Sequence, residues 1–438
     1  MSRRVFLSVL GTSVYKTCSY FYGDFHSSKV SFIQQATLEY LRVLDKWDKT
    51  KDKVIIIMTD KARQKNWDKN ITSRPDFSKN EVPYRGLEAV LDEMGLSPMV
   101  ETVCIPSGEN SEEIWEIFNR IYDALDNEDE LYIDITHSFR YLPMLLMVLC
   151  NYSKFMKDVK VKSITYGNYE ARDTSTDEAP IIDLLPISLL QDWTSAGADF
   201  IRNGRTKELS EISEETLRSI RKNQVDKQSD ANKLGRSVKS LNDIVEDFQL
   251  TQGSKIQKWE YKLTDIAKDG EDCARLIPPL MPIMQKIESS LEAFKPGGRA
   301  SNMISASRWC FDKHLYHQAI TLLREGVISY VCECCGINLY DKDKREVISG
   351  YLAHVDDFMM GESETKGISC EEKKAVLKSI LAKNLGREFF DKYSRLTDTR
   401  NYINHAGIRA NFSGNKALHD AIESSLLYFE NIVKNDPS

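Results

Sequence analysis

The sequence LYIDITHSFRYLPMLLMVLCNYSKFM, residues 131–156, contains a strand pattern and a helix pattern joined by a polar turn. Residues 131–136 form a short apolar run typical of a buried strand, and residues 142–156 are apolar along most of their length, as in a buried helix. The turn between them carries a histidine, a serine and an arginine. Polar side chains therefore lie where a strand ends and a helix begins, which is where α/β proteins bind ligands.

The same alternation of strand and helix patterns is found on both sides of this stretch. Short apolar runs predict strands at residues 5–10, 54–59, 100–106 and 161–167, and amphipathic segments predict helices at residues 31–44, 86–96 and 111–125. Ser111 is expected to cap the last of these helices, which has two glutamates in its first turn. Alternation of this length predicts an α/β domain whose parallel sheet is covered by helices on both faces.

The pattern changes after residue 205. The next seventy residues are charged and helix-prone, and they are followed by the proline-rich LIPPLMPIM (276–284) and the turn-rich FKPGGRASN (294–302). From residue 304 the helical pattern returns. We therefore predict an α/β domain at 1–205, a helical connector at 206–300 and a compact all-α domain at 301–438.

The composition excludes several classes of protein. The chain has 438 residues and a formal net charge of −7, so bulk charge does not indicate a nucleic-acid partner, and any such contact needs a local basic patch. The N-terminal MSRRVFLSVLGTSVY reads as a first strand rather than a signal peptide, and no apolar stretch has the length of a membrane span. Nine scattered cysteines, an odd number, indicate reduced thiols, and we expect a cytoplasmic protein without a membrane partner.

Three strand ends in the α/β part are polar and rich in turn residues. They are Gly11-Thr12-Ser13, Pro106-Ser107-Gly108 and the segment from Asp134 to Arg140. The last offers hydroxyls and an arginine at the start of a helix, a combination that suits a phosphate group. An alternative stays open, in which Thr136 or Ser138 only caps the helix and Arg140 pairs with a surface carboxylate. Neither a Walker A motif nor a G-x-G-x-x-G fingerprint is present, which disfavours ordinary nucleotide triphosphates and dinucleotides.

Several segments of this half resemble the CARF domain of ancillary proteins of type III CRISPR systems. These segments are LGTSVYKTCSYFYG, IPSGENSEEIWEIF, DITHSFRYLP and ITYG, within residues 1–200, and DITHSFR is the most specific of them. The resemblance implies a Rossmann-like sensor that binds cyclic oligoadenylate, its activator, across a homodimer interface. The residues that it implies for this ligand are Gly11, Thr12, Ser13, Lys16, Ser107, Gly108, Thr136, His137, Ser138, Phe139, Arg140, Tyr166 and Gly167.

A second group of polar residues lies near the C-terminus, in RNYINH at residues 400–405. On a helix, Arg400, Asn401, Asn404, His405 and Ile408 fall within an arc of about 140°. The opposite arc, which can pack inward, contains Leu396, Thr399, Tyr402, Ile403 and Ala406. The polar group is therefore expected to face away from its own domain, and Gly407 is expected to end the helix.

This group suits metal-independent cleavage of RNA. Attack by a ribose 2′-hydroxyl needs proton transfer, for which histidine is suited near neutral pH, and charge stabilisation, which a guanidinium supplies. The string RNYINHAG resembles the R-x4-6-H motif of HEPN ribonucleases, over residues 300–438. The resemblance implies Arg400, Asn401, Asn404 and His405 as catalytic residues, in a cleft between two copies, and YHQAITLLREGVISY as the partner helix with Glu325 as an ion-pairing or orienting residue.

The two resemblances together imply a CARF–HEPN endoribonuclease that cleaves single-stranded RNA when cyclic oligoadenylate binds. It would be a homodimer or a higher homo-oligomer and would need no metal or other cofactor for catalysis. The alternative is a non-catalytic regulator or binding protein that senses the cyclic nucleotide.

Other candidate groups are weaker. Cys332, Cys334 and Cys335, with Cys310, His314 and His317 upstream, could bind zinc, but adjacent cysteines are poorly spaced for it and buried thiols are favoured. Asp134 and His137 could be a catalytic pair, although a structural aspartate is favoured. Degradation of the activator by residues such as Thr12, Ser13 and Lys16 stays open.

Overall fold

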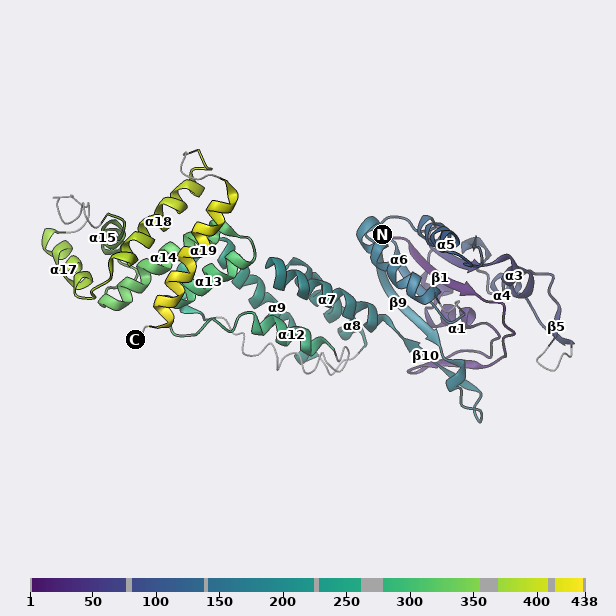
Figure 1. Ribbon diagram of the computed structural model, residues 1–438. Helices are drawn as coiled ribbons and strands as arrows, with labels where there is room; N and C mark the ends of the chain where they lie inside the picture. Colours follow the sequence, from purple (N-terminus) through teal and green to yellow (C-terminus); the bar gives the residue numbers. More distant parts are fainter. Residues whose placement is uncertain are drawn as a thin grey trace. The chain divides into compact units, whose positions relative to one another are not determined.

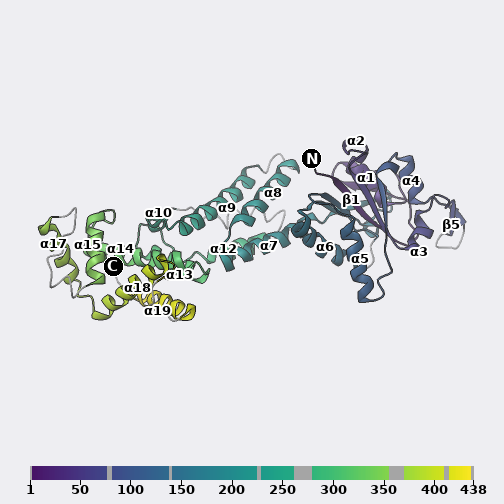
Figure 2. The same ribbon diagram turned by 90° about the horizontal axis from the view of Figure 1, so that it is seen from above.

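The computed structural model describes residues 2–75, 81–137, 141–223, 228–260, 279–354, 369–408 and 414–435. By its internal contacts the chain divides into two compact units, Met1–Ser188 and Leu189–Ser438 (Figures 1 and 2). The first unit is an α/β domain, and the second is helical, as the sequence predicts.

The first unit is built on an eight-stranded sheet of order β3-β2-β10-β9-β8-β1-β4-β7. Its bounds are β1 (Arg4–Leu10), β2 (Ser19–Tyr22), β3 (Phe25–His26), β4 (Lys53–Met58), β7 (Val100–Cys104), β8 (Glu130–Asp134), β9 (Lys160–Gly167) and β10 (Glu178–Asp183). The five strands predicted from the sequence are confirmed and pair in parallel. The other three extend the sheet beyond β9, where β10 runs antiparallel, so the sheet is mixed rather than wholly parallel. A separate hairpin joins β5 (Ser73–Pro75) and β6 (Glu81–Pro83).

The central strand β1 shows why helices cover both faces of this sheet. Val5, Leu7 and Val9 pack into one apolar cluster with α5 (Ser111–Asp123) and α6 (Leu142–Lys157). Phe6 and Leu10 point to the other face, into a cluster with α1 (Ile33–Tyr40), α2 (Val43–Lys46) and α4 (Leu87–Glu93). Alternating side chains of a strand point to opposite faces, so a continuous apolar run is buried on both. Short turns complete the unit: α3 (Asp60–Ala62), η1 (Arg63–Trp67), η2 (Ser97–Met99) and η3 (Tyr169–Ala171).

The prediction that Ser111 caps α5 is wrong by one residue. Asn110 is the N-cap, with extended backbone angles, and its side-chain oxygen accepts a hydrogen bond of 2.9 Å from the N–H of Glu113. Asparagine is as good a cap as serine, and the residue that leaves the helical conformation takes the role. The two first-turn glutamates, Glu112 and Glu113, are confirmed.

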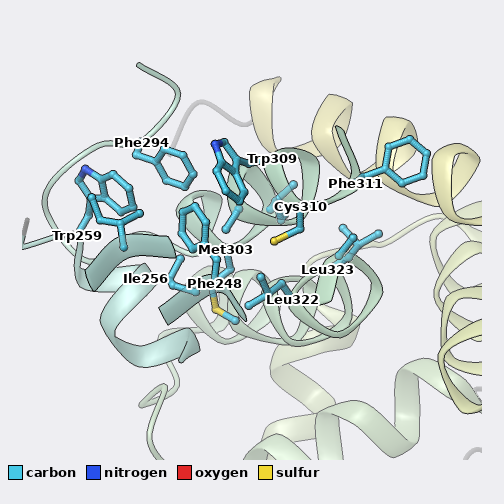
Figure 3. Packing of buried hydrophobic residues seen from close by; sticks show 14 of the residues in the cluster. Phe248, Ile256, Trp259, Phe294, Met303, Trp309, Cys310, Phe311, Leu322 and Leu323 are labelled. Atoms are coloured by element: carbon cyan, nitrogen blue, oxygen red, sulfur yellow. The ribbon is translucent and has the colours of Figure 1, made fainter. Parts of the chain in front are cut away.

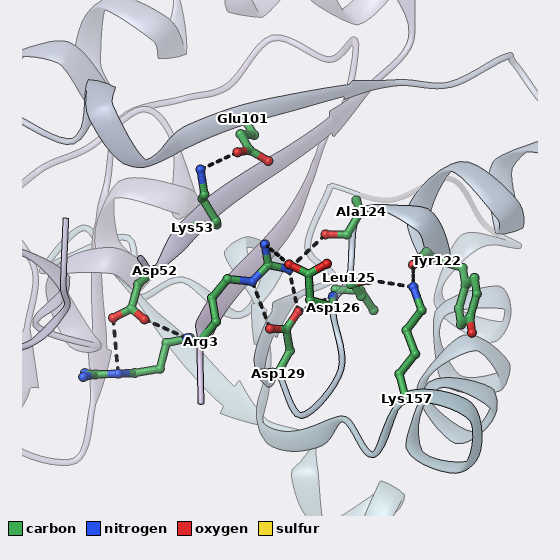
Figure 4. A network of polar contacts seen from close by, with 11 residues as sticks. Arg3, Asp52, Lys53, Glu101, Tyr122, Ala124, Leu125, Asp126, Asp129 and Lys157 are labelled. Atoms are coloured by element: carbon green, nitrogen blue, oxygen red, sulfur yellow. Dashed lines mark hydrogen bonds and ion pairs between the residues drawn. The ribbon is translucent and has the colours of Figure 1, made fainter. Parts of the chain in front are cut away.

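An ion-pair network fixes the amino end of β1 (Figure 4). Arg3 donates to both carboxylate oxygens of the fully buried Asp129, at 2.9 and 2.7 Å, and lies 2.8 Å from Asp126. The backbone N–H of Arg4 donates to Asp52 at 2.8 Å. These contacts lie at the edge opposite to the carboxyl ends of the parallel strands, so they anchor the sheet without entering the candidate ligand site.

The second unit consists of helices around one core. Its helices are α7 (Leu185–Asn203), α8 (Lys207–Asn223), α9 (Gln228–Gln249), α10 (Gly253–Lys258), α12 (Leu280–Ser289), α13 (Ser301–Asp312), α14 (Tyr316–Cys335), α15 (Lys342–Ala353), α17 (Cys370–Leu381), α18 (Arg387–Asn404) and α19 (Asn415–Lys434). Trp193 and Phe200 of α7 already belong to this core, which is why the contact boundary falls within α7 rather than near residue 205.

Aromatic side chains link the expected connector to the C-terminal helices (Figure 3). Trp259 stacks on Phe294 with ring centroids 4.0 Å apart, and Phe248 meets Trp309 of α13 edge-on at 4.9 Å. Residues 206–300 and 301–438 therefore share one hydrophobic core. The division of the chain into three domains stays a prediction.

Two further features concern the helices and the cysteines of the described ranges. Within the ranges that the structure describes, no helix combines the length and the apolarity needed to cross a membrane. The eight cysteines in those ranges are not joined in disulfide bonds.

Candidate functional site

The carboxyl ends of four parallel strands bring the candidate ligand residues to one edge of the sheet. Thr136, just after β8, donates its hydroxyl to Asp134 at 2.5 Å, and its oxygen accepts a hydrogen bond from the N–H of Gly167, at the end of β9, at 2.8 Å. Asp134 is fully buried and also accepts a hydrogen bond from Ser8 at 2.7 Å. Burial raises the pKa of Asp134, while these hydrogen bonds oppose the rise. The aspartate therefore has a structural role here.

The loop after β1 is fixed by two residues that sequence reasoning did not select. Asn66 of η1 donates to the backbone oxygens of Gly11 and Ser13, at 2.7 and 3.0 Å. Tyr15 accepts a hydrogen bond of 2.8 Å from the N–H of Gly11. A methyl group on Gly11 would lie 2.9 Å from that tyrosine oxygen, so the close approach requires glycine. Nothing in the sequence around Asn66 marks it, because its partners are some fifty residues away.

Among the described side chains at this edge of the sheet, that of His137 has the features most suited to binding a ligand. Its ring stacks on Tyr15 with centroids 4.0 Å apart, and its buried Nε2 has no hydrogen-bond partner among the described residues. Burial lowers the pKa of His137 to about 4, so the ring is neutral near pH 7. A buried polar atom without a partner is costly, and a ligand group can satisfy it. Ser138, Phe139 and Arg140 lie outside the described residues.

In the loop after β7, two backbone polar groups already have hydrogen-bond partners within the protein. Gly108 has a positive φ of 75°, and its N–H donates to Glu113 at 2.8 Å, so this N–H is already used. Tyr141 donates to the backbone oxygen of Ser107 at 3.2 Å. Of the remaining candidates, Thr12 and Tyr166 are half-buried and Lys16 is exposed. At this edge of the sheet, some candidate ligand residues are therefore exposed and others half-buried. The N–H of Gly108 already has a hydrogen-bond partner within the protein.

The second candidate site lies where α18 ends. The helix ends at Asn404, three residues before Gly407, which was expected to end it and which takes part in the termination. Ala406 has a positive φ of 53° and donates to Ile403 at 3.0 Å, and Gly407 donates to Tyr402 at 3.0 Å. This pair of bonds is a Schellman motif, in which a left-handed residue terminates the helix.

The expected division of α18 into a polar and an apolar face is seen only in part, since Tyr402 and Ile403 of the expected inward arc are half-buried. Leu396 and Thr399 are buried, whereas Arg400 and Asn401 are half-buried and Asn404 is exposed. His405 is the C-cap and is exposed, and within the described residues its imidazole makes no hydrogen bond or ion pair. Ile408 is 87% exposed beyond the helix end, and Ala406 is exposed rather than packed inward.

Asn404 is the centre of a polar cluster at this helix end. With its amide oxygen toward the guanidinium, this oxygen lies 2.9, 2.9 and 3.0 Å from Nε, Nη1 and Nη2 of Arg400, over the face of the cation. Its amide nitrogen then lies 2.9 Å from Nε2 of His317, on the first turn of α14. Arg400 also lies 3.4 Å from the side-chain oxygen of Asn401. The structure thus brings Arg400, Asn401 and Asn404 together and adds His317, which the sequence analysis considered only as a metal ligand.

The other sequence candidates of this unit lie elsewhere. Glu325 forms ion pairs with Arg324 at 2.6 Å and with Arg345 of α15 at 2.9 Å, so it is an ion-pairing residue whose orienting role stays a prediction. Cys310 and Cys332 are buried, and burial raises the pKa of both thiols. In the described ranges, one group of three possible metal ligands lies close together, and it consists of His419, Asp420 and Glu423. The cysteines are not part of this group.

Comparison with known proteins bears on the first unit most directly. Residues 5–170 match the family described as the CARF domain of the CRISPR system endoribonuclease Csx1. This match shows a CARF domain in the first unit and supports a CRISPR-associated protein. Over 96% of its length it is 23% identical to the CRISPR-associated protein MJ1674 of Methanocaldococcus jannaschii, and it spans 63% of the length of that relative.

Proposed function

We propose that the protein is a metal-independent endoribonuclease that cleaves single-stranded RNA and is activated by cyclic oligoadenylate. One observation carries the proposal: the Arg400 guanidinium and the Asn404 amide lie in contact at the accessible end of α18, next to the exposed His405. The same chain carries a CARF domain, a class of domain that binds ligands of the cyclic oligoadenylate type. A cytoplasmic location and a homodimer belong to the same proposal.

The chemistry at this helix end follows from the three side chains. The 2′-oxygen of a ribose attacks the adjacent phosphorus, so a bond between phosphorus and this oxygen forms and the bond to the 5′-oxygen breaks. The proton of the 2′-hydroxyl passes to a neutral imidazole, and a protonated imidazole donates a proton to the leaving 5′-oxygen. Arg400, fixed by Asn404, stabilises the charge that develops on the phosphate. In a homodimer, each copy would contribute one imidazole and one guanidinium.

The ligand edge of the CARF domain suits a cyclic oligoadenylate in a specific way. The neutral His137 ring and the stacked Tyr15 offer an aromatic surface and a ring nitrogen that lacks a partner among the described residues. Adenine presents both an aromatic face and hydrogen-bonding groups, so it can use both features. We propose the residues of the Gly11–Ser13 and Thr136–Arg140 segments, with Lys16, Ser107, Gly108, Tyr166 and Gly167, as the surface around this ligand.

The test is cleavage of labelled single-stranded RNA in EDTA, with and without cyclic tetra- or hexaadenylate. We expect cleavage only with an activator, and none of a DNA of the same sequence, which lacks the attacking hydroxyl. His405→Ala and Arg400→Ala should each lower the rate by about 10²-fold or more. Cleavage that persists in both variants would refute the site assignment, and a strict need for Mg²⁺ would refute the mechanism.

Binding of cyclic oligoadenylate without any RNA cleavage would instead support the non-catalytic regulator. That alternative has one observation in its favour, because within the described residues nothing orients the His405 imidazole. The proposed dimer would have to supply that orientation. Analytical ultracentrifugation of the wild-type protein therefore belongs to the same experiment.

A further inference from the structure

His317 lies at the proposed cleavage site although it is 87 residues away from Asn404 in the sequence. It occupies the first turn of α14, and its Nε2 is 2.9 Å from the amide of Asn404. Both side chains are exposed, so they are accessible to a substrate. Packing of α14 against α18 brings them together.

Arg400 determines the direction of the hydrogen bonds in this cluster. A guanidinium has donors and no acceptor, so the group of Asn404 that faces it must be the amide oxygen. The amide nitrogen of Asn404 then points to His317 and donates to Nε2 at 2.9 Å. A ring nitrogen that accepts a hydrogen bond carries no proton. In this orientation of the amide, His317 accepts through Nε2, and its ring proton is on Nδ1.

We propose that His317 is a positioning residue for Arg400 and acts through Asn404. By accepting from the amide nitrogen, the imidazole keeps the partly negative amide oxygen toward the guanidinium cation, 2.9 to 3.0 Å from its three nitrogens. Without this acceptor, the amide is free to rotate. If a hydrogen-bond donor replaced His317, the Asn404 amide would turn its oxygen toward that donor. Its N–H groups would then face the N–H groups of Arg400, which is unfavourable. The inference rests on the proposed function, because it assigns His317 to the same site.

The neighbouring histidine of the turn before α14 provides a matched control. His314 is also exposed, and its Nδ1 lies 2.8 Å from the hydroxyl of Tyr316, so its bond is with its own turn. The ring of Tyr316 in turn meets His419 of α19, with centroids 5.6 Å apart. Loss of His314 therefore removes an exposed imidazole from the same end of the bundle without removing a partner of Asn404.

Kinetics of the full-length, activated protein test the role. We expect His317→Ala to lower kcat by about 10- to 100-fold, with the KM for RNA changed by less than about threefold, since a hydrogen bond that fixes a charged group is lost. His317→Gln should restore kcat to within about threefold of the wild type, because its amide oxygen can accept from Asn404. His314→Ala should stay within about twofold of the wild type. Asn404→Ala combined with His317→Ala should be no slower than the slower single variant.

A spectroscopic measurement tests the hydrogen-bond direction independently of activity. In nitrogen-15 NMR of histidine-labelled protein near neutral pH, the His317 signal, assigned from the His317→Gln spectrum, should show a protonated Nδ1 and an unprotonated Nε2. A protonated Nε2 would overturn the inference.

The kinetic outcomes separate this inference from the proposed function. If the wild type cleaves RNA and His405→Ala does not, then wild-type kcat in His317→Ala overturns the positioning role and leaves the nuclease intact. Failure of His317→Gln to restore activity, with its thermal unfolding unchanged, also overturns it. If the activated wild type cleaves no RNA, the proposed function fails and the role of His317 fails with it.

Discussion

Ala406 holds a backbone conformation that glycine adopts more easily. Its φ of 53° is left-handed, which costs a residue with a Cβ about 1 kcal/mol or more. Ala406→Gly removes this strain but gives the unfolded chain more freedom, so we expect a net gain of about 0.5 kcal/mol in the free energy of unfolding. Gly407→Ala, at a φ of 72° with the Tyr402 hydroxyl 3.1 Å from the new Cβ, should instead lose about 1 kcal/mol. Urea unfolding measures both, and equal stability of the two variants would contradict the helix-end geometry.

His137 makes stability depend on pH in a defined direction. Its pKa is about 4 in the folded protein and about 6.5 when exposed, so between these values the unfolded chain binds more protons. The neutral form of His137 thus adds up to about 3 kcal/mol to the free energy of unfolding. This stabilisation is complete above pH 6.5 and is lost as the pH falls toward 4. We expect His137→Gln to flatten this part of the stability curve, measured by urea unfolding at several pH values. An unchanged slope in the variant would show that other groups cause it.

At the scale of residues, the sequence indicated some of the site and missed the rest for a physical reason. Arg400 and His405 lie within one short motif, so their proximity needs only a local helix. His317, Tyr15 and Asn66 act through contacts that depend on packing between distant segments. No spacing rule connects such positions, and the chemistry of an exposed histidine is ambiguous without its neighbours.

At the scale of elements, the five parallel strands β1, β4, β7, β8 and β9 were predictable, and the three strands beyond β9 were not. Buried strands such as β4 are unbroken apolar runs, which the sequence shows directly. By contrast, β2 and β3 have four and two residues, and β10 contains Pro180. Segments as short as β2 and β3 carry too few side chains for a recognisable period, and the proline in β10 argues against a strand inside a sheet, although β10 pairs on both sides.

The junction of β1 and β8 offers a test of element pairing. Arg3 holds Asp129, which is fully buried, through two hydrogen bonds. Arg3→Ala leaves that carboxylate without its cation, and we expect a loss of about 3 kcal/mol in the free energy of unfolding. Arg3→Lys restores the charge but not the two-pronged contact, so its loss should be smaller but measurable. Chemical unfolding of the three proteins checks this order, and a loss in Arg3→Ala below about 1 kcal/mol would show that the pair is not important for the sheet.

At the scale of the whole molecule, the shared core of the second unit predicts where the chain can be divided. Phe248, Trp259 and Phe294 complete the core around Trp309. A fragment of residues 301–438 lacks these three rings and exposes the apolar side of α13, so we expect it to unfold without a cooperative transition. A fragment of residues 189–438 retains them and should unfold cooperatively on heating. Circular dichroism compares the two, and cooperative unfolding of the shorter fragment would support an independent C-terminal domain.

The proposed activation by cyclic oligoadenylate has a thermodynamic consequence for RNA binding. If cyclic oligoadenylate favours a state that binds RNA more tightly, RNA must tighten the binding of cyclic oligoadenylate by the same factor, typically between about 5- and 150-fold. An RNA with 2′-O-methyl groups cannot be cleaved and makes the equilibrium measurable by calorimetry on the full-length protein. We expect it to lower the Kd of the activator at least about fivefold, and less in Arg400→Ala, in which the RNA site is weakened. Equal activator affinity with and without this RNA would mean that the ligand changes only the rate of the chemical step, since reciprocity applies to binding and not to kcat.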